Sequence, residues 1–304
     1  MSFSLEHCGH GNANVIFRYD GDHNAKLRHK VLRLRKEASF DSFDASAQHD
    51  FQKLVVNTVL KAVNKNVLSS ELVPLSIENF EGLNELLCKH PTRPAKFVSS
   101  RINTDAKHGL LLPLLQDSST HRLLEFKPKW LTQSPNAPRD AMMCRTCALR
   151  LSRQASKSHT LDINQRFCPL DLASRDEGRV SRAFHGLNYE NNWHLTTTEF
   201  LSLTHTFCQH PLVDELTCAQ SKYGHELALA MTLRDCSVYI ELSRSTAQVA
   251  NLWIADLDRK SLSKKASWEA MEGTLEKEGW YHGKGLSPHH RPCIRLAKNI
   301  EFVN

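Results

Sequence analysis

Acidic side chains occur in two apolar segments of this sequence. Asp235 lies within "AMTLRDCSVYIEL", and Asp256 and Asp258 lie at the end of "VANLWIADLD". A carboxylate in apolar surroundings must be paired, hydrogen-bonded or bound to a metal, because desolvating it alone is costly. A turn or capping role would explain the Asp256–Asp258 pair equally well on its own. Phosphoryl transfer explains both groups together, since one aspartate can accept the proton of an acceptor hydroxyl while another holds the magnesium that bridges ATP phosphates.

Two lysines are spaced along the apolar stretch "LLEFKPKWL" at 123–131. Alternate side chains of an extended strand share a face, so Glu125 and Lys127 would point one way and the apolar residues beside them the other. Pro128 fixes its own backbone angle and keeps the preceding residue extended. Lys127 and Lys129 would thereby be held in a fixed direction, which suits a bound anion better than solvent.

A basic run, "KLRHKVLRLRK" at 26–36, carries seven basic side chains, counting its histidine, and no acidic one. A solvated edge strand with cationic side chains explains most runs of this kind. Here the alternation places Leu32 and Leu34 on one face and Arg33 and Arg35 on the other. We therefore expect one face to be buried while two arginines share the opposite face.

Glycines precede this run in "GHGNAN" at 9–14. Glycines that bend a loop so that backbone N–H groups face outward make a cradle for an anion, although many hairpins carry two glycines without binding anything. Arg33 on the next strand strengthens the reading, because in kinase-like lobes a glycine-rich hairpin covers the ATP phosphates and a cation on a neighbouring strand grips them.

Further cations recur at helical spacing. Lys260, Lys264 and Trp268 fall at i, i+4 and i+8, on one face of a helix, and Arg145 and Arg153 are eight residues apart on an earlier helix. A solvated surface is the default for any one of them. Together with the two lysines of "EFKPKW", they could converge on a ligand that carries several phosphates.

Strands and one helix come first in the predicted order of elements. The pattern predicts strands at 12–18 and 29–36, a helix at 46–64, and strands at 95–100 and 109–115. These would form a small sheet-based lobe, residues 1–117. A second lobe, 118–304, would hold a strand at 121–127, a loop at 132–139, a helix at 140–154, paired strands at 229–242 and 248–255, and a helix at 263–278. The predicted fold class is α+β.

Composition is typical of a globular protein, with 40% of the 304 residues hydrophobic and 24% charged. The net charge of +6 favours anionic over cationic partners. No apolar run approaches the ~20 residues needed to cross a bilayer, and the N-terminal stretch "MSFSLEHCGHGNANV" lacks the pattern of a secretory signal.

Nine cysteines are scattered along the chain, and this odd number fits a reducing compartment better than a set of disulfides. We therefore expect a nuclear or cytoplasmic protein. Cys144 and Cys147 form a C-x-x-C pair, and Cys168 follows downstream. A structural zinc site needs four ligands, so packed thiols on a helix are the favoured interpretation.

Eight short motifs, in order along nearly the whole chain, resemble those of the inositol-pentakisphosphate 2-kinase family, and the modest length is similar to that of a fungal member. They are "GHGNAN", "KVLRLRK", "EFKPKW", "CRTCALR", "CPLDLAS", "NNW", "AMTLRDCS" and "DLDRK". The resemblance implies transfer of the ATP γ-phosphate to the axial 2-hydroxyl of inositol 1,3,4,5,6-pentakisphosphate, giving inositol hexakisphosphate, with ATP and Mg²⁺ as cofactors. It also implies a two-lobed fold distantly related to protein kinases, with a small β-rich N-lobe and a larger α/β C-lobe bearing helical inositide-binding insertions.

The resemblance also implies roles for individual positions. Asp235 matches the base, Lys127 the lysine nearest the reacting hydroxyl, and Asp256, with Asp258, the magnesium ligands. The ATP-binding positions would be Gly11, Asn12, Ala13, Asn14 and Arg33 at the phosphates, with Leu115 and Asp117 at the hinge. The substrate phosphates would be held by Lys127, Lys129, Arg101, Arg145, Arg153, Asn191, His194, Lys260, Lys264 and Trp268.

Some positions depart from the family pattern. Leu149 stands where relatives have histidine in "R-x-x-x-H", which removes a contact unless Arg150 supplies it. His194 stands where an arginine is expected after "NN", which would make substrate affinity sensitive to pH. Trp268 replaces a tyrosine of the plant enzymes, whose zinc-binding insertion is not evident here.

Two other readings stay open. An inositol-polyphosphate kinase of different positional specificity, such as a multikinase, would carry "P-x-x-x-D-x-K-x-G", a motif that the sequence lacks. A non-catalytic basic module for RNA or membrane phosphoinositides would leave Asp235 and Asp256 unexplained, and the basic run at 26–36 has no interleaved aromatic residue for nucleic-acid stacking. We expect a monomer with a small-molecule substrate and neither a nucleic acid nor a membrane as partner.

Overall fold

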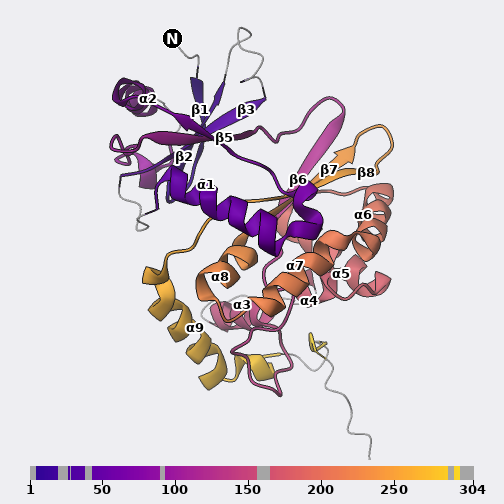
Figure 1. Cartoon of the computed structure of the whole chain (residues 1–304). Helices are drawn as coiled ribbons and strands as arrows, with labels where there is room; N and C mark the ends of the chain where they lie inside the picture. Colours follow the sequence, from indigo (N-terminus) through magenta and orange to yellow (C-terminus); the bar gives the residue numbers. More distant parts are fainter. Residues whose placement is uncertain are drawn as a thin grey trace, which may run out of the picture. The chain divides into compact units, whose positions relative to one another are not determined.

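The structure is a computed structural model of the chain, and it describes residues 5–19, 27, 29–37, 43–89, 93–155, 165–286 and 291–294 (Figure 1). The chain divides into two compact units. Unit 1 comprises Met1–Asp117 and Leu257–Ser263, and unit 2 comprises Ser118–Asp256 and Lys264–Asn304. No helix in the described ranges is long and apolar enough to span a bilayer.

An antiparallel sheet of five strands forms the centre of unit 1. In spatial order its strands are β1 (Leu5–His10), β2 (Asn14–Tyr19), β3 (Lys30–Arg35), β5 (His108–Pro113) and β4 (Glu71–Pro74). The helices of this unit are α1 (Ala45–Leu54), continued by a π turn (Val55–Val59) and a 3₁₀ turn (Lys61–Asn66), then α2 (Ile77–Lys89) and a 3₁₀ turn (Ala95–Phe97).

One face of the unit 1 sheet is buried as the alternation of β3 predicts. Leu32 and Leu34 join a core cluster with apolar residues of β2 and α2. Gly109 of β5 permits this packing, because a Cβ there would lie 2.8 Å from a Leu32 methyl carbon and 2.7 Å from one of Leu34. The opposite face of β3 is also covered, since Arg35 is itself buried.

A smaller antiparallel sheet and a set of helices form unit 2. The sheet has the order β6 (His121–Phe126), β7 (Ser237–Ser243) and β8 (Val249–Ala255). The helices are α3 (Arg145–Ala155), α4 (Pro169–Leu172), α5 (Glu177–Asn191), α6 (Thr197–Gln209), α7 (Pro211–Lys222), α8 (Leu227–Asp235) and α9 (Lys265–Lys277), with a 3₁₀ turn at Trp280–His282. A short 3₁₀ turn, Leu262–Lys264, precedes α9.

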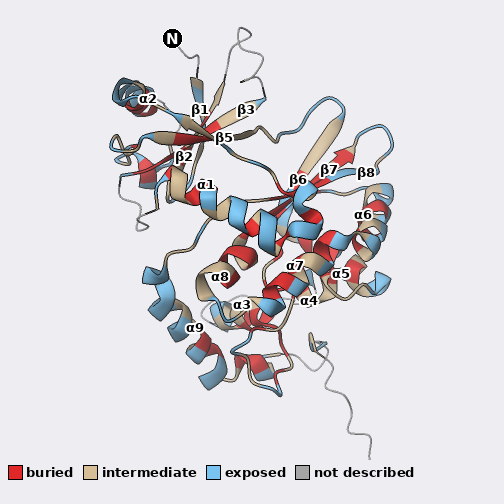
Figure 2. Ribbon diagram, in the orientation of Figure 1, coloured by how far each residue is buried: buried red, intermediate tan, exposed pale blue. Residues whose placement is uncertain are grey.

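Aromatic side chains link the small sheet to its helices. The ring of Phe126 on β6 lies 5.9 Å from Phe167 and 6.1 Å from Phe207 of α6. Phe184 of α5 packs edge-on against Phe207 at 4.9 Å. Buried residues in red extend along α7 and α8 (Figure 2), so these helices are part of the same interior.

The predicted α+β class is confirmed, and most predicted strands and helices are present within a few residues. The strand predicted at 229–242 is wrong in its first half, because Leu227–Asp235 is helix α8. Four consecutive residues of α8, Ala230 to Leu233, are buried, and a helix buried on all sides lacks the periodicity that distinguishes it from a buried strand.

The strand predicted at 95–100 is also wrong, since this segment is a 3₁₀ turn followed by further turns. Arg93 explains the difference, because its guanidinium donates to the backbone oxygens of Phe97 and Ser100. These carbonyl groups are therefore satisfied by a side chain and not by a neighbouring strand. Strands β1 and β4 and helix α2 were not predicted.

Candidate active site

The three-stranded sheet of unit 2 gathers charged residues at one end. Both strand pairs are antiparallel, so the end of β6, the start of β7 and the end of β8 meet. Lys127 directly follows β6, Asp256 directly follows β8, and Asp235 ends α8 just before β7. Strand register, rather than closeness in sequence, therefore brings these three residues together.

Lys127 connects the parts of this cluster. Its Nζ donates to the backbone oxygen of Asp235 at 2.7 Å, to Ser237 Oγ at 3.2 Å and to Asp256 Oδ2 at 3.0 Å. Burial lowers the pKa of Lys127, but the carboxylates of Asp256 and Asp235 outweigh burial and leave this pKa above its usual value. The side chain therefore stays an ammonium group at neutral pH.

Lys129 and Arg234 flank the carboxylate of Asp235. Lys129 Nζ lies 3.4 Å from Oδ1, and Arg234 donates to Oδ1 at 3.3 Å and to Oδ2 at 3.2 Å. Burial lowers the pKa of Lys129, and the nearby cations Lys127 and Arg234 add to that effect against the opposing pull of Asp235. The Asp235 side chain remains 28% exposed, so it lies between cations and is still accessible to a ligand.

Two residues of the cluster have an uncommon backbone conformation. Lys129 and Asp256 have φ of 60° and 59°, in the left-handed region, which costs a non-glycine residue on the order of 1–3 kcal/mol. Gln220 of α7 holds the first of these turns. Its Nε2 donates to the Lys129 backbone oxygen at 2.7 Å, and its Oε1 accepts from the Leu131 N–H at 2.7 Å. A buried amide thus fixes the loop that presents Lys129.

In unit 1, Arg33 and Asp258 form a two-pronged ion pair. Nη1 donates to Oδ1 at 2.9 Å, and Nη2 donates to Oδ2. With its amide oxygen turned toward Arg33, Asn14 accepts from Nε at 3.2 Å. Burial raises the pKa of Asp258, but Arg33 outweighs burial and holds this pKa below its usual value. Arg33 and Asp258 therefore form one charged assembly on β3 and the 257–263 segment.

The glycine-containing turn between β1 and β2 differs from the predicted cradle. The Gly11 N–H donates within the turn, to the Asn14 oxygen at 2.9 Å, and the Lys36 N–H donates to the Ala13 oxygen at 3.0 Å. A Cβ at Gly11 would meet only the Asn14 oxygen, at 3.7 Å. The turn does not require glycine, and the Gly11 N–H does not face outward. Asn12, at the tip of the turn, is exposed.

Arg145, one of the predicted phosphate ligands, lies in a buried network of unit 2. Its Nε donates to Glu272 Oε2 of α9 at 2.6 Å, and both side chains are close to 10% exposed, at 10% and 11%. Glu272 Oε1 also accepts from Ser134 Oγ at 2.9 Å and from the Tyr281 hydroxyl. The structure thus gives Arg145 a partner on α9, which ties the start of α3 to that helix.

The other predicted substrate residues of unit 2 lie at element ends or on exposed surfaces. Arg153 is exposed in the last turn of α3, and Asn191 ends α5 with its amide bonded to the backbone one turn earlier at 2.9 Å. His194 is exposed, with φ of 52°. Lys264 is exposed at the N-cap of α9, and Trp268 is half-buried one turn into that helix.

The remaining predicted residues belong to unit 1. Arg101 and Asp117 are exposed, while Leu115 and Lys260 are half-buried. The expectation that Lys260, Lys264 and Trp268 share one helical face is wrong for Lys260, because α9 begins only at Lys265. The segment before it, starting with "DLDRK", is irregular and lies partly in the other unit, and the spacing pattern could not reveal that boundary.

Several residues of the cluster were not identified from sequence. Ser237 Oγ donates to Glu125 Oε1 at 2.8 Å and accepts from Lys127, so it links two strands at the site. Arg234 adjoins Asp235 in "LRDCS", and this adjacency was the available signal for it. The sequence holds no signal for Gln220, because this residue acts on a loop about ninety residues earlier in the chain.

Magnesium favours carboxylate oxygens and usually binds through one or two carboxylates together with substrate phosphates. Asp256 fits this chemistry, since its side chain is 39% exposed. Asp258 fits less well, because both of its oxygens accept from Arg33. The donor set therefore supports Asp256 as the primary candidate ligand.

Clustered lysine and aspartate side chains at a sheet end are the residue types that phosphotransferases use. Comparison with known proteins narrows this class. The family model of inositol-pentakisphosphate 2-kinase matches residues 7–219 and 199–274. The chain therefore belongs to the inositol-pentakisphosphate 2-kinase family, which confirms the resemblance noted from its motifs.

Two relatives named inositol-pentakisphosphate 2-kinase extend the match over most of the chain. The protein of Yarrowia lipolytica is 28% identical over 300 residues, covering 91% of this chain and 92% of the relative. The protein of Kluyveromyces lactis is 24% identical over 290 residues, covering 88% of this chain and 92% of the relative.

Proposed function

We propose that this protein is an ATP-dependent kinase that phosphorylates the 2-hydroxyl of inositol 1,3,4,5,6-pentakisphosphate to give inositol hexakisphosphate. Family membership supports the reaction. The observation that carries the proposal is the joining of Asp235 and Asp256 through Lys127, with Lys129 alongside. A base, a metal ligand and two phosphate-binding cations are what transfer to a phosphorylated alcohol requires.

In this mechanism Asp235 accepts the proton of the 2-hydroxyl as its oxygen attacks the γ-phosphorus, the bond from that phosphorus to the β–γ bridging oxygen breaks, and ADP leaves. Lys127 balances negative charge on the transferred phosphoryl group, and its raised pKa supports a permanently charged form. Lys129 holds a neighbouring phosphate of the inositide. Because little covalent work remains for the protein, most of the rate enhancement comes from positioning and charge stabilisation.

Unit 1 supplies the nucleotide side of the proposal. Arg33, Asn12, Ala13 and Asn14 bind the ATP phosphates, and Gly11 lies beside them in the same turn. Leu115 and Asp117 form the hinge beside adenine. The arginine replaces the lysine of protein kinases, and its planar guanidinium can bind a phosphate through two parallel hydrogen bonds. This division corresponds to the two-lobed, kinase-like organisation expected of the family.

Asp256 would hold magnesium, which would supply charge neutralisation at the ATP phosphates. Asp258 acts mainly through Arg33, because its two oxygens already receive the guanidinium. The two aspartates therefore differ in role. Asp256 would contact the metal, whereas Asp258 positions the Arg33 guanidinium that contacts ATP.

The remaining cations and polar groups hold the inositide phosphates: Arg101, Arg153, Asn191, His194, Lys260 and Lys264, with Trp268 beside them. Each phosphate monoester carries about −1.5 to −2 charges near neutral pH, and five of them repel the tail of ATP unless cations intervene. Arg145 contributes by orienting α9 through Glu272, and α9 begins beside Lys264. A ring lacking one phosphate would leave cations facing one another, which is the basis of specificity.

The test is incubation of the purified chain with Mg²⁺, ATP and inositol pentakisphosphate, followed by chromatography of the products. Formation of inositol hexakisphosphate, lost in Asp235→Asn, supports the proposal. If the enzyme instead prefers inositol rings with fewer phosphates over inositol pentakisphosphate, its positional specificity is different.

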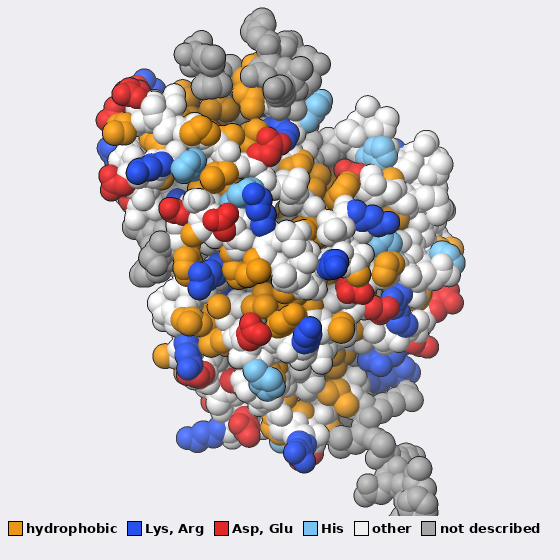
Figure 3. Space-filling model, viewed as in Figure 1, with side chains coloured by type: hydrophobic (Ala, Val, Ile, Leu, Met, Phe, Trp, Pro, Cys, Tyr) orange, Lys and Arg blue, Asp and Glu red, His pale blue; other side chains and the backbone are white. Residues whose placement is uncertain are grey.

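Binding of RNA or phosphoinositide vesicles without turnover would indicate the non-catalytic module. Among the coloured side chains on the face in Figure 3, lysines and arginines are interspersed with acidic and hydrophobic ones and do not form one stripe, which favours the kinase.

A further inference from the structure

Gln220 of α7 is one of the most deeply buried polar side chains of unit 2, with only 1% of its surface exposed. Besides its two bonds to the loop that carries Lys129, its Nε2 donates to the backbone oxygen of Leu233 at 3.2 Å. Leu233 lies in the last turn of α8, two residues before Asp235. One amide group therefore joins the backbone beside the proposed phosphate-binding lysine to the backbone beside the proposed base.

The amide of Gln220 matches all three of its backbone partners. Its Oε1 accepts from the Leu131 N–H at 2.7 Å, and its Nε2 donates to the Lys129 oxygen at 2.7 Å and to the Leu233 oxygen. A glutamine side chain offers two N–H donors, and both are used here. Turning the amide over would set its oxygen against two carbonyl groups, and an ionised carboxylate would do the same. The three bonds therefore specify both the residue type and the orientation of its amide.

The end of α8 depends on such partners, because the last four carbonyl groups of a helix have no partner within it. The Leu233 oxygen accepts from Gln220 and from the Cys236 thiol, each at 3.2 Å. The Asp235 oxygen accepts from Lys127 Nζ at 2.7 Å. The segment 127–131 is thus tied to the end of α8 twice, directly through Lys127 and indirectly through Gln220.

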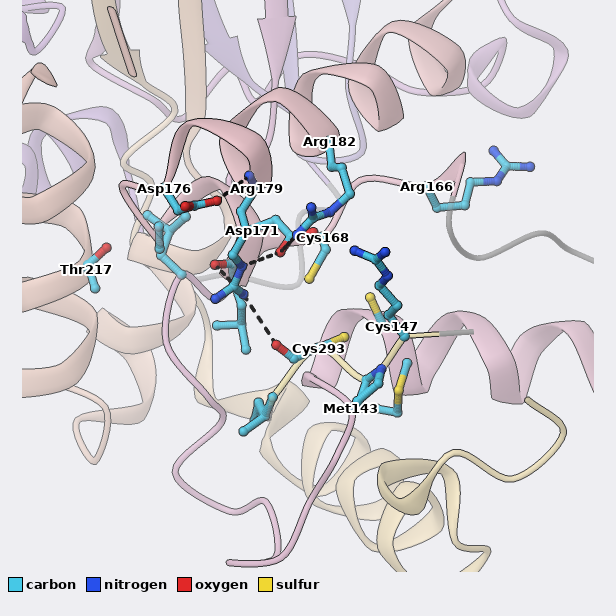
Figure 4. Close-up of a pocket in the computed structure, with 16 residues that line it drawn as sticks. Met143, Cys147, Arg166, Cys168, Asp171, Asp176, Arg179, Arg182, Thr217 and Cys293 are labelled. Carbon is cyan, nitrogen blue, oxygen red and sulfur yellow. Dashed lines mark hydrogen bonds and ion pairs between the residues drawn. The ribbon is translucent and has the colours of Figure 1, made fainter. Parts of the chain in front are cut away.

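A cavity of about 1200 Å³ adjoins the contact between α7 and the loop that carries Lys129. Leu131 and Thr217 both line this cavity, and Figure 4 shows Thr217 of α7 on its wall. Thr217 and Gln220 are three residues apart and so share a face of the helix. Close packing is therefore incomplete on one side of the contact, and the bonds of Gln220 hold the loop against α7. Lys129, with φ of 60°, depends on that support, because an uncommon backbone conformation persists only where its surroundings fix it.

We propose that Gln220 is a positioning residue of the kinase, which sets the separation between Lys129 and the carboxylate of Asp235. Lys129 Nζ lies 3.4 Å from Asp235 Oδ1. An inositide phosphate on Lys129 then places the 2-hydroxyl of the same ring against Asp235, and a shift of either segment takes the hydroxyl away from its base. The inference rests on the proposed function and gives Gln220 no contact with the substrate.

Gln220→Met keeps the length of the side chain and removes all three bonds. Its kcat/KM for inositol pentakisphosphate should fall about 10²-fold, the loss that a displacement of about 1 Å can cause, while its Kd for ATP should change less than twofold. Val213→Ala, at a buried position of the same helix, is the control for lost stability and should keep a kcat/KM close to wild type. A wild-type kcat/KM in Gln220→Met, or the same loss in both variants, would overturn the proposal.

Gln220→Glu gives a readout that a general loss of stability would not produce. The ionised carboxylate has no donor for the two carbonyl groups, whereas the protonated acid can donate to one of them. Burial raises the pKa of such a carboxyl, so the turnover of Gln220→Glu divided by that of wild type should rise at least ~5-fold as pH falls from about 8 to about 6. Gln209→Glu, exposed at the end of α6, should give a constant ratio. An equally constant ratio for Gln220→Glu would overturn the proposal.

Hydrogen exchange of the wild-type chain tests the same contact without a variant and without turnover. In the absence of ligands the Leu131 N–H should exchange as slowly as the central amides of α7, because its bond to Gln220 is buried. A chain that turns over but exchanges Leu131 as fast as an exposed loop would refute this inference alone. A chain that protects Leu131 but forms no inositol hexakisphosphate would refute the proposed function, and with it the catalytic role of Gln220.

Discussion

Lys127 Nζ lies 3.0 Å from Asp256 Oδ2, and the same ammonium donates to the backbone oxygen of Asp235 at 2.7 Å and to Ser237 Oγ at 3.2 Å. One side chain thus connects the end of β8 with the end of α8. An arriving phosphate would compete with the Asp256 carboxylate for the same cation. Metal binding to Asp256 would relieve that competition, because the metal takes over its negative charge.

Replacing the proposed base tests the chemical step. Asp235→Asn should lower turnover by roughly 10²- to 10⁴-fold, the usual contribution of a general base, since the amide cannot accept the hydroxyl proton. Circular dichroism and the melting temperature should stay close to wild type. Asp50→Asn, at an exposed position of α1, serves as control. Turnover within a few-fold of wild type in Asp235→Asn would remove this residue from the mechanism.

The two neighbouring aspartates should respond differently to magnesium. Asp256→Asn should raise the Mg²⁺ concentration needed for half-maximal turnover by at least tenfold, because a ligand is lost. Asp258→Asn should raise the KM for ATP with little change in magnesium dependence, since it releases Arg33. Magnesium titrations at saturating inositide distinguish the two cases. A shared magnesium defect would make both residues ligands.

Lys129 should affect the inositide and not the nucleotide. Lys129→Met removes a cation held beside Asp235, so the Kd for inositol pentakisphosphate should rise at least tenfold while the Kd for ATP changes less than twofold. Calorimetric titration of each ligand measures both. Lys277→Met, at an exposed position in the last turn of α9, is the control. Equal losses for both ligands would show that the assignment is wrong.

The buried pair of Arg145 and Glu272 should be important for stability. Arg145→Met leaves a buried carboxylate with a lost partner, which costs about 3–5 kcal/mol of unfolding free energy. The double variant Arg145→Met with Glu272→Gln should recover part of this loss. Urea unfolding measures both. The exposed Lys265–Glu269 pair of α9 is the matched control, and Lys265→Met should cost at most about 0.5 kcal/mol. A similarly small loss for Arg145→Met would contradict the buried network.

Lys36 should make stability depend on pH. Burial, with help from Arg93 and Lys96, lowers its pKa to about 8 from 10.5. Between these values the unfolded chain binds a proton that the folded chain has released. Unfolding free energy should therefore rise as pH increases from about 8 to about 10.5.

Lys36→Met should flatten this rise relative to wild type, while Lys53→Met, exposed on α1, should not. Denaturant unfolding at several pH values provides the measurement. Parallel pH profiles for wild type and Lys36→Met would show that folding does not lower the pKa of Lys36.

Residues of the candidate site could be picked out from the sequence where a charged residue directly follows a strand with a recognisable apolar pattern. Lys127 follows a strand whose alternation is visible in "LLEF", and Asp256 follows the apolar run of β8. The partners of these residues were less accessible. Gln220 and Glu272 act across long sequence separations, and their positions depend on packing that single-sequence periodicity does not contain.

The prediction of helix or strand was wrong where burial removed the periodicity of the sequence. Helix α8 is buried along consecutive positions, so its apolar run resembled a strand. The helical face proposed for Lys260 failed because spacing alone cannot tell where α9 begins. The turn at Gly11 was expected to aim backbone N–H groups outward, but the Gly11 N–H donates to the Asn14 oxygen within the turn.

The segment Leu257–Ser263 returns from unit 2 to complete unit 1, and it brings Asp258 to Arg33. An N-terminal fragment ending at residue 117 would lack this carboxylate and leave a buried guanidinium without its counterion. Unit 1 is thus finished only after the ribosome has synthesised nearly all of the chain, so its last ion pair forms late in translation. Unit 1 is therefore completed only after strands β6 to β8 and helices α3 to α8 of unit 2 have been synthesised.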